Sequence, residues 1–527
     1  MTETEPLIPR LQPADYPDHT PVAFTEQLRR AAGARPEHVA LIDGDQATTW
    51  AELFARVDRL RIKLAAAGIG RGSMVASLAE NSAAHVVVYL AVVGIGACMV
   101  PLPGGAHPDT LGTMLRDSGA ALLFHSPALA AAAQATATQT GEVELVEMDR
   151  LDGWRNERLP APADRSTANL DDPFDMIYSS GTTGDPKGIL HDHRFRLRQI
   201  LRMSSYGLDQ DAILTMSTPF YSNTTLVAVL PVLLNGGTVV VMRKFDASGF
   251  LALCARHRVS HAMLVPVQYD RILDAADFDR FDLSAFRVKL STSAPFPARL
   301  KREVLRRWPG KLFEIYGMTE GGVSTVLDCG RFPDKLDSVG RPVEGAEVRI
   351  LDDQGHELPR GEIGEVVGRS PTMMPGYHNA PAKTSEILWK SPQGEDFIRT
   401  GDMGRLDADG FLYLLDRRKD MILSGGFNIY AADLEQVLTR HDAVAEAAVI
   451  AIPSDAWGET PLGLVVLKPD AQVEAEALRD FANRQLGKTQ RLSAVEIRTA
   501  LPRSDIGKIL KRELRAPYWE HADRTAE

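Results

Sequence analysis

Apolar residues recur at helical spacing in the segment that follows Thr49. Thr48 or Thr49 can cap a helix that begins near Trp50, and Gly68 can end it. The apolar positions of that helix lie at steps of four, three and four, at Leu53, Val57, Leu60 and Leu64. Because residues at this spacing share one side of a helix, the pattern predicts a helix with a single buried face.

Strand-like and helix-like segments alternate over much of the chain. Residues 74–78, 237–242 and 262–265 are short apolar runs typical of buried strands, and residues 247–257 follow a helical pattern. The most apolar segment, residues 86–103, contains Gly94 and Gly96, which favours a buried helix and a core strand over a membrane span. The alternation predicts an α/β fold of layered sheets with parallel pairing.

The pattern changes after about Val339. Short runs such as 346–351 and 364–367 are separated by Gly, Pro and Asp, which predicts a β-rich subdomain. Beyond Asp420 the pattern predicts a helix at 433–440, strands at 447–452 and 463–468, a helix at 473–486 and a last strand near Val495. We therefore expect a small C-terminal α/β domain of roughly a hundred residues.

Composition limits the class of protein. A chain of 527 residues is too long for one ordinary core and should form at least two domains. Its net charge of −11 and its lack of a long basic run argue against nucleic acid or an anionic membrane surface as a partner. The three cysteines are far apart, which suggests neither a zinc site nor a disulfide framework. The acidic, proline-containing first residues are unlike a signal peptide, so we expect a cytoplasmic protein.

The segment from Ser179 to Gly188, SSGTTGDPKG, carries the clearest chemistry. Its glycines allow backbone N–H groups to approach a ligand, while four hydroxyl groups and the Lys187 ammonium add donors. This pattern predicts a loop that binds nucleotide phosphates, although similar clusters also occur in ordinary surface loops. A Walker loop is excluded, because Pro186 and Gly188 stand where that motif needs glycine and a hydroxyl residue.

The loop resembles the signature of the adenylate-forming enzymes, which include acyl-CoA synthetases, peptide-synthetase adenylation domains and firefly luciferase. The resemblance spans nearly the whole chain, because further motifs recur in the family's order. These are YGMTE at 316–320, RTGD at 399–402, DRRKD at 416–420, SGGFN at 424–428 and PRSDIGK at 502–508. The resemblance implies an N-terminal domain at 1–416, a hinge at 417–420 and a mobile C-terminal domain at 421–527.

By this resemblance the chain uses ATP, Mg²⁺ and CoA to activate a small carboxylic acid. Lys187 and the loop Ser179, Ser180, Gly181, Thr182, Thr183 and Gly184 would hold the β- and γ-phosphates. Thr319 would contact the α-phosphate and Glu320 would bind Mg²⁺, which prefers carboxylate and phosphate oxygens. The adenosine would lie among Ser293, Ala294, Pro295, Glu314, Tyr316 and Gly317, with its ribose hydroxyls on Asp402 and Arg417.

The resemblance gives the C-terminal domain two tasks. Lys508 would bridge the carboxylate and the α-phosphate during adenylation, a role that suits a compact charge on a long stem. The domain would then turn about Lys419 and present Ser424, Gly425, Gly426 and Phe427 to the CoA thiol. From local sequence alone, Lys508 fits a basic surface patch and residues 416–420 fit a charged turn equally well.

The position of the acid pocket also follows from the resemblance. Its expected lining is Tyr221, Ser222, Asn223, Thr224, Val267, Gln268, Thr292, Gly321 and Gly322. A mainly apolar pocket with some hydroxyl and amide groups suits an aromatic acid of the hydroxycinnamate or benzoate type, or a medium-chain or alicyclic acid. Two alternatives to a CoA ligase stay open: an enzyme that loads a separate carrier protein, and a non-catalytic ATP-binding regulator.

Overall fold

The computed structural model describes residues 24–141, 143–151, 153–154, 168–179, 186–417, 420–424, 427–454, 456–487, 490–504 and 507–525. The chain packs into two compact units. Unit 1 comprises Met1–Asp337, Pro342–Glu347 and Arg369–Ile398, and unit 2 comprises Ser338–Arg341, Val348–Gly368 and Arg399–Glu527. The two units are defined by how residues pack and do not test the expected hinge at 417–420. The hinge stays a prediction, because Arg418 and Lys419 lie outside the described residues.

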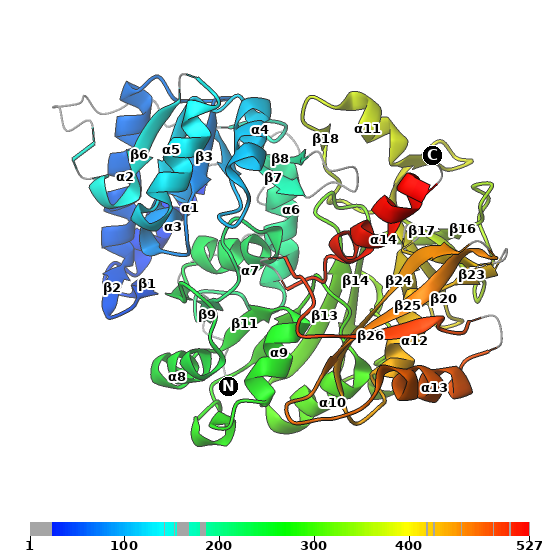
Figure 1. Ribbon diagram of the computed structural model, residues 1–527. Coiled ribbons are helices and arrows are strands. Elements are labelled where there is room, and N and C mark those ends of the chain that lie inside the picture. Colours follow the sequence, from blue (N-terminus) through cyan, green and yellow to red (C-terminus); the bar gives the residue numbers. More distant parts are fainter. Residues whose placement is uncertain are drawn as a thin grey trace. The chain divides into compact units, whose positions relative to one another are not determined.

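Unit 1 contains two large sheets and the helices packed on them (Figure 1). One sheet has the order β14-β13-β12-β11-β9-β10-β1-β2 and the other the order β18-β8-β7-β4-β3-β5-β6. The strands of the first sheet are β1 (Val39–Asp43), β2 (Gln46–Thr49), β9 (Ile213–Met216), β10 (Thr238–Val241), β11 (His261–Leu264), β12 (Val288–Ser291), β13 (Lys311–Gly317) and β14 (Ser324–Asp328). Those of the second are β3 (Met74–Leu78), β4 (Cys98–Pro101), β5 (Leu122–His125), β6 (Glu144–Glu147), β7 (Pro173–Ser179), β8 (Lys187–Asp192) and β18 (Gly376–Tyr377).

The predicted parallel pairing is confirmed in both sheets. Strands β9, β11, β12 and β13 are parallel neighbours, and so are β3, β4, β5 and β7 in the second sheet. The antiparallel pairs lie toward the edges of the sheets, and among them is the hairpin of β7 with β8, in which Ser179 stands opposite Lys187. The predicted phosphate loop is therefore the connection between two paired strands.

The helices of unit 1 are α1 (Phe24–Ala34), α2 (Trp50–Ala66), α3 (Ala83–Gly94), α4 (Pro108–Ser118), α5 (Ala130–Thr138), α6 (His193–Ser204), α7 (Asn223–Leu234), α8 (Ala247–His257), α9 (Pro266–Leu273), α10 (Ala298–Arg307) and α11 (Pro381–Glu386). Apolar side chains of α1, α2, α3, α6 and α7 form one core with side chains from both sheets. The expected helix at Trp50 is α2, capped by Thr49, and its four predicted apolar positions are buried. Residues 86–103 form a buried helix and a core strand, as predicted.

Unit 2 holds the β-rich segment and the small C-terminal α/β region that the sequence predicts. Strands β16 (Glu347–Leu351), β17 (Gly364–Arg369) and β20 (Asp396–Leu406) are neighbours, and β21 (Leu412–Arg417) pairs with β20. A further sheet has the order β23-β22-β25-β24, with β26 beside β25. Its strands are β22 (Ile422–Ser424), β23 (Phe427–Ile429), β24 (Val444–Ser454), β25 (Gly458–Leu467) and β26 (Ala494–Arg498). The helices are α12 (Ala431–Leu438), α13 (Ala475–Gln485) and α14 (Lys511–Thr525).

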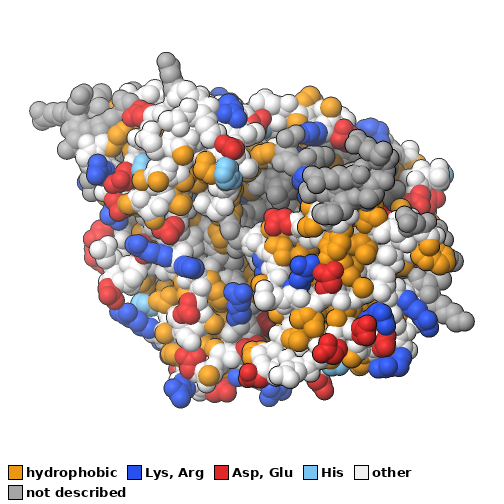
Figure 2. All heavy atoms as spheres, in the orientation of Figure 1, with side chains coloured by type: hydrophobic (Ala, Val, Ile, Leu, Met, Phe, Trp, Pro, Cys, Tyr) orange, Lys and Arg blue, Asp and Glu red, His pale blue; other side chains and the backbone are white. Residues whose placement is uncertain are grey.

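Two short strands remain, β15 (Arg341–Pro342) and β19 (Leu388–Lys390), and β19 pairs with the start of β20 in unit 1. Strands β15, β16, β17 and β20 contain residues of both units. Among the described residues, no helix has the length and apolar character needed to cross a membrane. On the face that Figure 2 shows, Lys and Arg side chains are interspersed with Asp and Glu.

Candidate active site

The expected substrate residues of unit 1 follow the ends of neighbouring parallel strands. Residues 221–224 come after β9, residues 267 and 268 after β11, residues 292–295 after β12, and residues 319–322 after β13. The carboxyl ends of parallel strands meet at one edge of a sheet, and ligands of open α/β sheets bind there. Segments that are up to a hundred residues apart in sequence are thus brought to a common edge.

Tyr377 connects two residues that the sequence assigns to ATP. Its hydroxyl donates to Oε1 of Glu320 at 2.8 Å, and the Lys187 ammonium lies 5.2 Å from the centre of its ring. Burial and the adjacent Glu320 carboxylate raise the pKa of Tyr377, so the hydroxyl keeps its proton. The predicted phosphate lysine and the predicted Mg²⁺ ligand are therefore tied to the same aromatic side chain.

The segment 372–377 is fixed against the Thr319–Gly322 turn by backbone contacts. The amide of Met374 donates to the carbonyl of Glu320, and that of Gly322 donates to the carbonyl of Thr372, both at 2.9 Å. Gly321 has a φ of 76°, and a Cβ there would overlap the Thr372 carbonyl oxygen. Position 321 therefore requires glycine for two reasons: the neighbouring backbone leaves no room for a Cβ, and the positive φ disfavours other residues.

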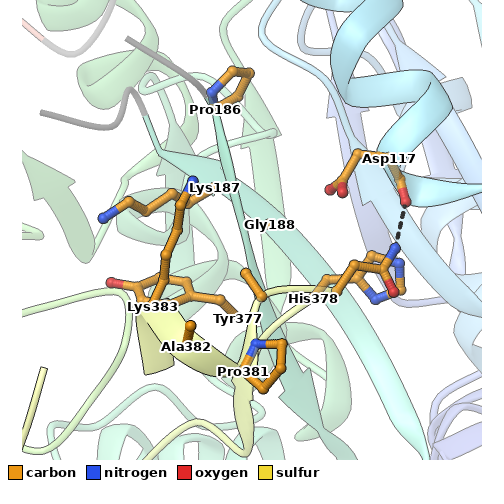
Figure 3. Close-up of a pocket in the computed structure, with 11 residues that line it drawn as sticks. Asp117, Pro186, Lys187, Gly188, Tyr377, His378, Pro381, Ala382 and Lys383 are labelled. Atoms are coloured by element: carbon orange, nitrogen blue, oxygen red, sulfur yellow. Dashed lines mark hydrogen bonds between the residues drawn. The ribbon is translucent and has the colours of Figure 1, made fainter. Parts of the chain in front are cut away.

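A cavity of about 380 Å³ opens beside Lys187 (Figure 3). It is lined by Asp117, Pro186, Lys187, Gly188, Tyr377, His378, Asn379, Ala380, Pro381, Ala382 and Lys383. Figure 3 shows the Lys187 and Lys383 side chains near the Tyr377 ring, while Asp117 and His378 lie across strand β8. Two ammonium groups at one end of the cavity favour an anionic ligand there.

A buried polar network lies behind Thr319. His191 on β8 contacts the Thr319 carbonyl oxygen through Nε2 and an Asp175 carboxylate oxygen through Nδ1, both at 2.7 Å. The Arg196 guanidinium donates to the same carboxylate and to Oδ1 of Asn223, at the start of α7. The network thus reaches both the adenylation motif and the expected acid pocket.

A direct contact joins a residue of the expected acid pocket, Thr224, to a residue expected beside the adenosine, Ser293. The hydroxyl oxygens of Thr224 and Ser293 lie 2.6 Å apart, although β9 and β12 are not adjacent. Ser293 has a φ of 78°, a strained conformation for a residue other than glycine. Asn81 fixes the loop that precedes residues 221–224. Its side-chain nitrogen donates to three backbone carbonyls, and its side-chain oxygen accepts from the Phe220 amide.

Glu314, which the sequence places near the adenine, is buried on β13 and forms an ion pair with Lys301. Burial raises the pKa of Glu314 to about 7 against the opposing effect of the Lys301 ammonium. Lys301 also donates to the carbonyl of Leu336 at 2.6 Å. Tyr316 lies two residues further along β13, half-buried, and the adenine contacts of both residues stay predictions.

Two expected site features lie in unit 2. Asp402 on β20 stands directly opposite Arg417 on β21 in the antiparallel pair, which places the two expected ribose contacts together. Lys508 closes a turn in which its amide donates to the Ser504 hydroxyl and its carbonyl accepts from the Ser504 amide. Arg503 braces this turn by donating to the Gly507 carbonyl and to Glu446.

Several predicted site residues cannot be placed. Ser180, Gly181, Thr182, Thr183, Gly184, Lys419, Gly425 and Gly426 lie outside the described residues, as do the side chains of Ser179, Arg417 and Phe427. Their roles stay predictions. Among the described residues no cluster of His, Cys, Asp and Glu could enclose a metal ion.

Several other residues that contact these motifs were not predicted from the sequence. Tyr377, Asp175, His191, Arg196 and Asn81 act through partners far away in the chain, such as Thr319, 128 residues beyond His191. A weak signal existed in the polar run His191-Asp192-His193, which directly follows the apolar Ile189 and Leu190. Polar side chains at a predicted strand end mark a candidate site even when their partners are unknown.

Comparison with known proteins supports this assembly of motifs. Residues 28–378 match the model of the AMP-binding enzyme family, and residues 433–508 match that of the AMP-binding enzyme C-terminal domain. The chain is 34% identical over 495 residues to a feruloyl-CoA synthase of an Amycolatopsis species, covering 93% of this chain and 98% of the relative. It is 31% identical over 530 residues to 4-coumarate–CoA ligase 5 of Oryza sativa subsp. japonica, covering 96% of each.

A solved structure agrees with the sequence comparison. The o-succinylbenzoate CoA synthetase of Bacillus subtilis, in complex with its acyl-adenylate intermediate, has a TM-score of 0.82 and 29% identity, covering 94% of this chain and 98% of that one. The order of the motifs, the sequence relatives and the solved structure all indicate the same family. The chain is a member of the AMP-binding enzyme family, with both its large domain and its C-terminal domain.

Proposed function

We propose that the protein is an ATP-dependent carboxylic acid:CoA ligase. In the first half-reaction a carboxylate oxygen attacks the α-phosphorus of ATP, the bond to the β-phosphate oxygen breaks, and pyrophosphate leaves. In the second, the CoA thiol loses its proton to solvent, the resulting thiolate forms a bond to the acyl carbon, the bond between that carbon and the phosphate oxygen breaks, and AMP leaves. The observation that carries the proposal is that Lys187 and Glu320 both contact Tyr377. These contacts bring together a cation that would bind the phosphates and a carboxylate that would bind their Mg²⁺.

The polyphosphate would lie at the Lys187 end of the cavity. Lys187 and Lys383 supply positive charge there, and backbone N–H groups of the preceding loop would add donors. Such fixed donors offset the repulsion between two anionic reactants and stabilise charge that develops on phosphorus. Positioning and electrostatics therefore account for most of the expected catalysis.

Glu320 fits a role as ligand of Mg²⁺. One of its carboxylate oxygens accepts from Tyr377, so the group is oriented, and no cluster of acidic residues surrounds it among the described residues. Mg²⁺ commonly binds one or two carboxylates together with substrate phosphates rather than a cage of protein ligands. The ion would neutralise phosphate charge, while the protein's own task is to hold Glu320 in place.

We assign the bridging of carboxylate and α-phosphate to Lys508, and thioester formation to the Ser424–Phe427 segment. The backbone of the turn that carries Lys508 is held by the Ser504 hydroxyl and by Arg503. A rotation of the C-terminal domain between the two half-reactions follows from the family resemblance. It explains why one small domain carries two different site motifs.

For the acid we propose an aromatic substrate of the hydroxycinnamate or benzoate type. Relatives named for feruloyl, coumarate and succinylbenzoate substrates support this class. The Thr224 and Ser293 hydroxyls supply a polar pair at the strand edge that could bond a ring substituent. A hydroxyl pair that bonds a substituent of the substrate discriminates against substrates that lack the matching group.

The test is pyrophosphate release from purified protein with ATP and Mg²⁺ across aryl, alicyclic and straight-chain acids, each with and without CoA. We expect the greatest kcat/KM with aryl acids, together with a CoA thioester as product. Higher efficiency with saturated fatty acids would refute the aromatic assignment. Release without a thioester would point to a carrier-protein acceptor, and no release with any acid would refute the ligase.

A further inference from the structure

The buried network behind Thr319 is made by side chains from five elements. Its members are Tyr89 of α3, Asp175 of β7, His191 of β8, Arg196 and Gln199 of α6, and Asn223 of α7. Tyr89, Asp175, His191 and Arg196 are fully buried. Charged groups that are removed from water need fixed partners, so the arrangement of their donors and acceptors is informative.

Asp175 is the shared acceptor of this network. Its Oδ2 accepts from the Tyr89 hydroxyl at 2.5 Å and from Nε of Arg196 at 2.8 Å, and its Oδ1 lies 2.7 Å from Nδ1 of His191. Burial opposes ionisation, yet the Arg196 and His191 charges lower the pKa of Asp175 to about 2. The carboxyl group is therefore ionised and can only accept hydrogen bonds.

Both ring nitrogens of His191 face oxygen atoms that carry no proton. Nδ1 lies 2.7 Å from the Asp175 carboxylate, and Nε2 lies 2.7 Å from the carbonyl oxygen of Thr319. Each nitrogen must therefore donate, which requires the imidazolium form. One Arg196 nitrogen also lies 3.0 Å from Nδ1, but the contact of Nδ1 with the carboxylate is shorter, and Arg196 has its own acceptors on Asp175.

The network then contains two cations and one carboxylate. Around it lie the neutral Tyr89 hydroxyl, the Phe195 ring stacked 4.1 Å from the His191 ring, and the amide oxygens of Gln199 and Asn223. The Asp192 carboxyl, next to His191 in the chain, also interacts electrostatically with the His191 ring. The His191 ring is bonded to the motif expected to contact the α-phosphate, so the imidazolium charge lies directly behind that motif.

We infer that His191 is a positioning residue, held as an imidazolium by Asp175, that fixes the Thr319–Glu320 peptide and keeps a buried positive charge behind the adenylation site. The inference that this aids catalysis rests on the proposed function. A planar trans peptide with its carbonyl held by His191 directs the Glu320 N–H to the opposite side. Tyr377 holds the Glu320 side chain at the same time, so the motif is fixed at both backbone and side chain.

The charge state is tested on the wild-type protein, without reference to activity. Deuterated protein with ¹⁵N-labelled histidine is examined by long-range ¹H–¹⁵N correlation between pH 6 and 9, and the His191 signals are assigned by their absence in His191→Gln. Tyr89→Phe, which removes only one hydroxyl from Asp175, provides a second assignment through shifted signals should His191→Gln fail to fold. We expect a proton on both nitrogens at pH 7, and an unprotonated nitrogen at that pH would overturn the inference.

The positioning role is tested in single-turnover adenylation. In His191→Gln both N–H donors lie on a single nitrogen, which cannot replace two ring nitrogens that face different acceptors. We therefore expect kcat to fall about 100-fold, with KM for ATP and acid little changed. His193→Gln is the matched control, because His193 is equally buried two residues further along the chain but packs against the Phe24 and Phe174 rings. Equal losses of kcat in the two variants would contradict the positioning role.

If the wild-type protein releases no pyrophosphate with any acid, the proposed function fails while the spectrum still reports the charge of His191. If release occurs and the spectrum shows a neutral ring, the inference fails alone. The two failures are therefore distinguishable.

Discussion

At the scale of single residues, Tyr377 makes two contacts that can be separated by substitution. Tyr377→Phe keeps a ring beside Lys187 but removes the hydroxyl that donates to Glu320. A hydrogen bond to a charged group contributes roughly 1.5–3 kcal/mol, and about 1.4 kcal/mol corresponds to a tenfold change in rate. We expect adenylation to slow by at least about tenfold, measured as initial pyrophosphate release at saturating acid.

The control for this change is Tyr377→Leu, which removes the ring as well and should slow the reaction further. Wild-type rates in Tyr377→Phe would show that Glu320 does not depend on the hydroxyl. Because the pKa of Tyr377 is raised by burial and by Glu320, the effect should be constant between pH 7 and 9.

His193 provides a prediction about pH and stability. Burial lowers its pKa from 6.5 to about 4, and neither of its ring nitrogens has a hydrogen-bond partner in the described structure. Since the unfolded state binds the proton more readily, this group's contribution to stability is present above pH 6.5 and is lost as pH falls toward 4. The full loss corresponds to about 3 kcal/mol, at 1.36 kcal/mol per unit of pKa.

His193→Phe removes this titration and places a third aromatic ring beside Phe24 and Phe174. Urea denaturation at pH 7.5 and pH 5 measures the outcome. We expect the wild-type free energy of unfolding to fall more than that of the variant over this interval, by about 2 kcal/mol. Parallel losses in the two proteins would show that His193 is not the acid-sensitive group.

At the scale of elements, the cap of α2 can be tested directly. The Thr49 hydroxyl accepts from the Glu52 amide at 3.3 Å, and the Glu52 carboxylate accepts from the Thr49 amide at 2.8 Å. Thr49→Ala should lower the free energy of unfolding by about 1 kcal/mol. Glu52→Gln keeps an acceptor for the Thr49 amide and should change stability by less than about 0.5 kcal/mol, so equal losses in chemical denaturation would contradict the cap.

Elements with a strong periodic pattern could be predicted from sequence. The α2 helix, the β3 strand and the helix at Ala247–His257 depend on burial of their own apolar positions, which is a local property. Strand β18, by contrast, has two residues, and only its pairing with β8 makes it a strand. Short elements of this kind depend on distant partners, so no local pattern indicates them.

The same distinction separates the parts of the site. Lys187, Thr319 and Glu320 lie in contiguous motifs, and their order along the chain could be recognised. Tyr89 and Asp175, which are 86 residues apart, meet only after both sheets and their helices have packed. A buried carboxylate with two cationic neighbours has no sequence signature, because its neighbours are chosen by topology.

At the scale of the whole molecule, the two half-reactions should depend on different residues of unit 2. Lys508→Ala removes the ammonium but keeps the backbone bonds of its turn with Ser504, so the fold should persist. We expect it to abolish acyl-adenylate formation and to leave thioester formation from supplied acyl-adenylate largely intact. Arg512→Ala, which removes a nearby exposed cation, is the control and should retain both activities.

Gly425→Leu should give the reverse pattern. Gly425 follows Ser424 on β22, and a side chain there is expected to obstruct the pantetheine arm while the ATP residues of unit 1 are untouched. Pyrophosphate release should then continue without thioester. Opposite losses in the two variants would show that a single small domain serves both steps in turn, because each variant would retain the step that the other lacks. If Lys508→Ala lost both steps, or if Gly425→Leu made thioester normally, the assignment of separate tasks to these two motifs would be wrong.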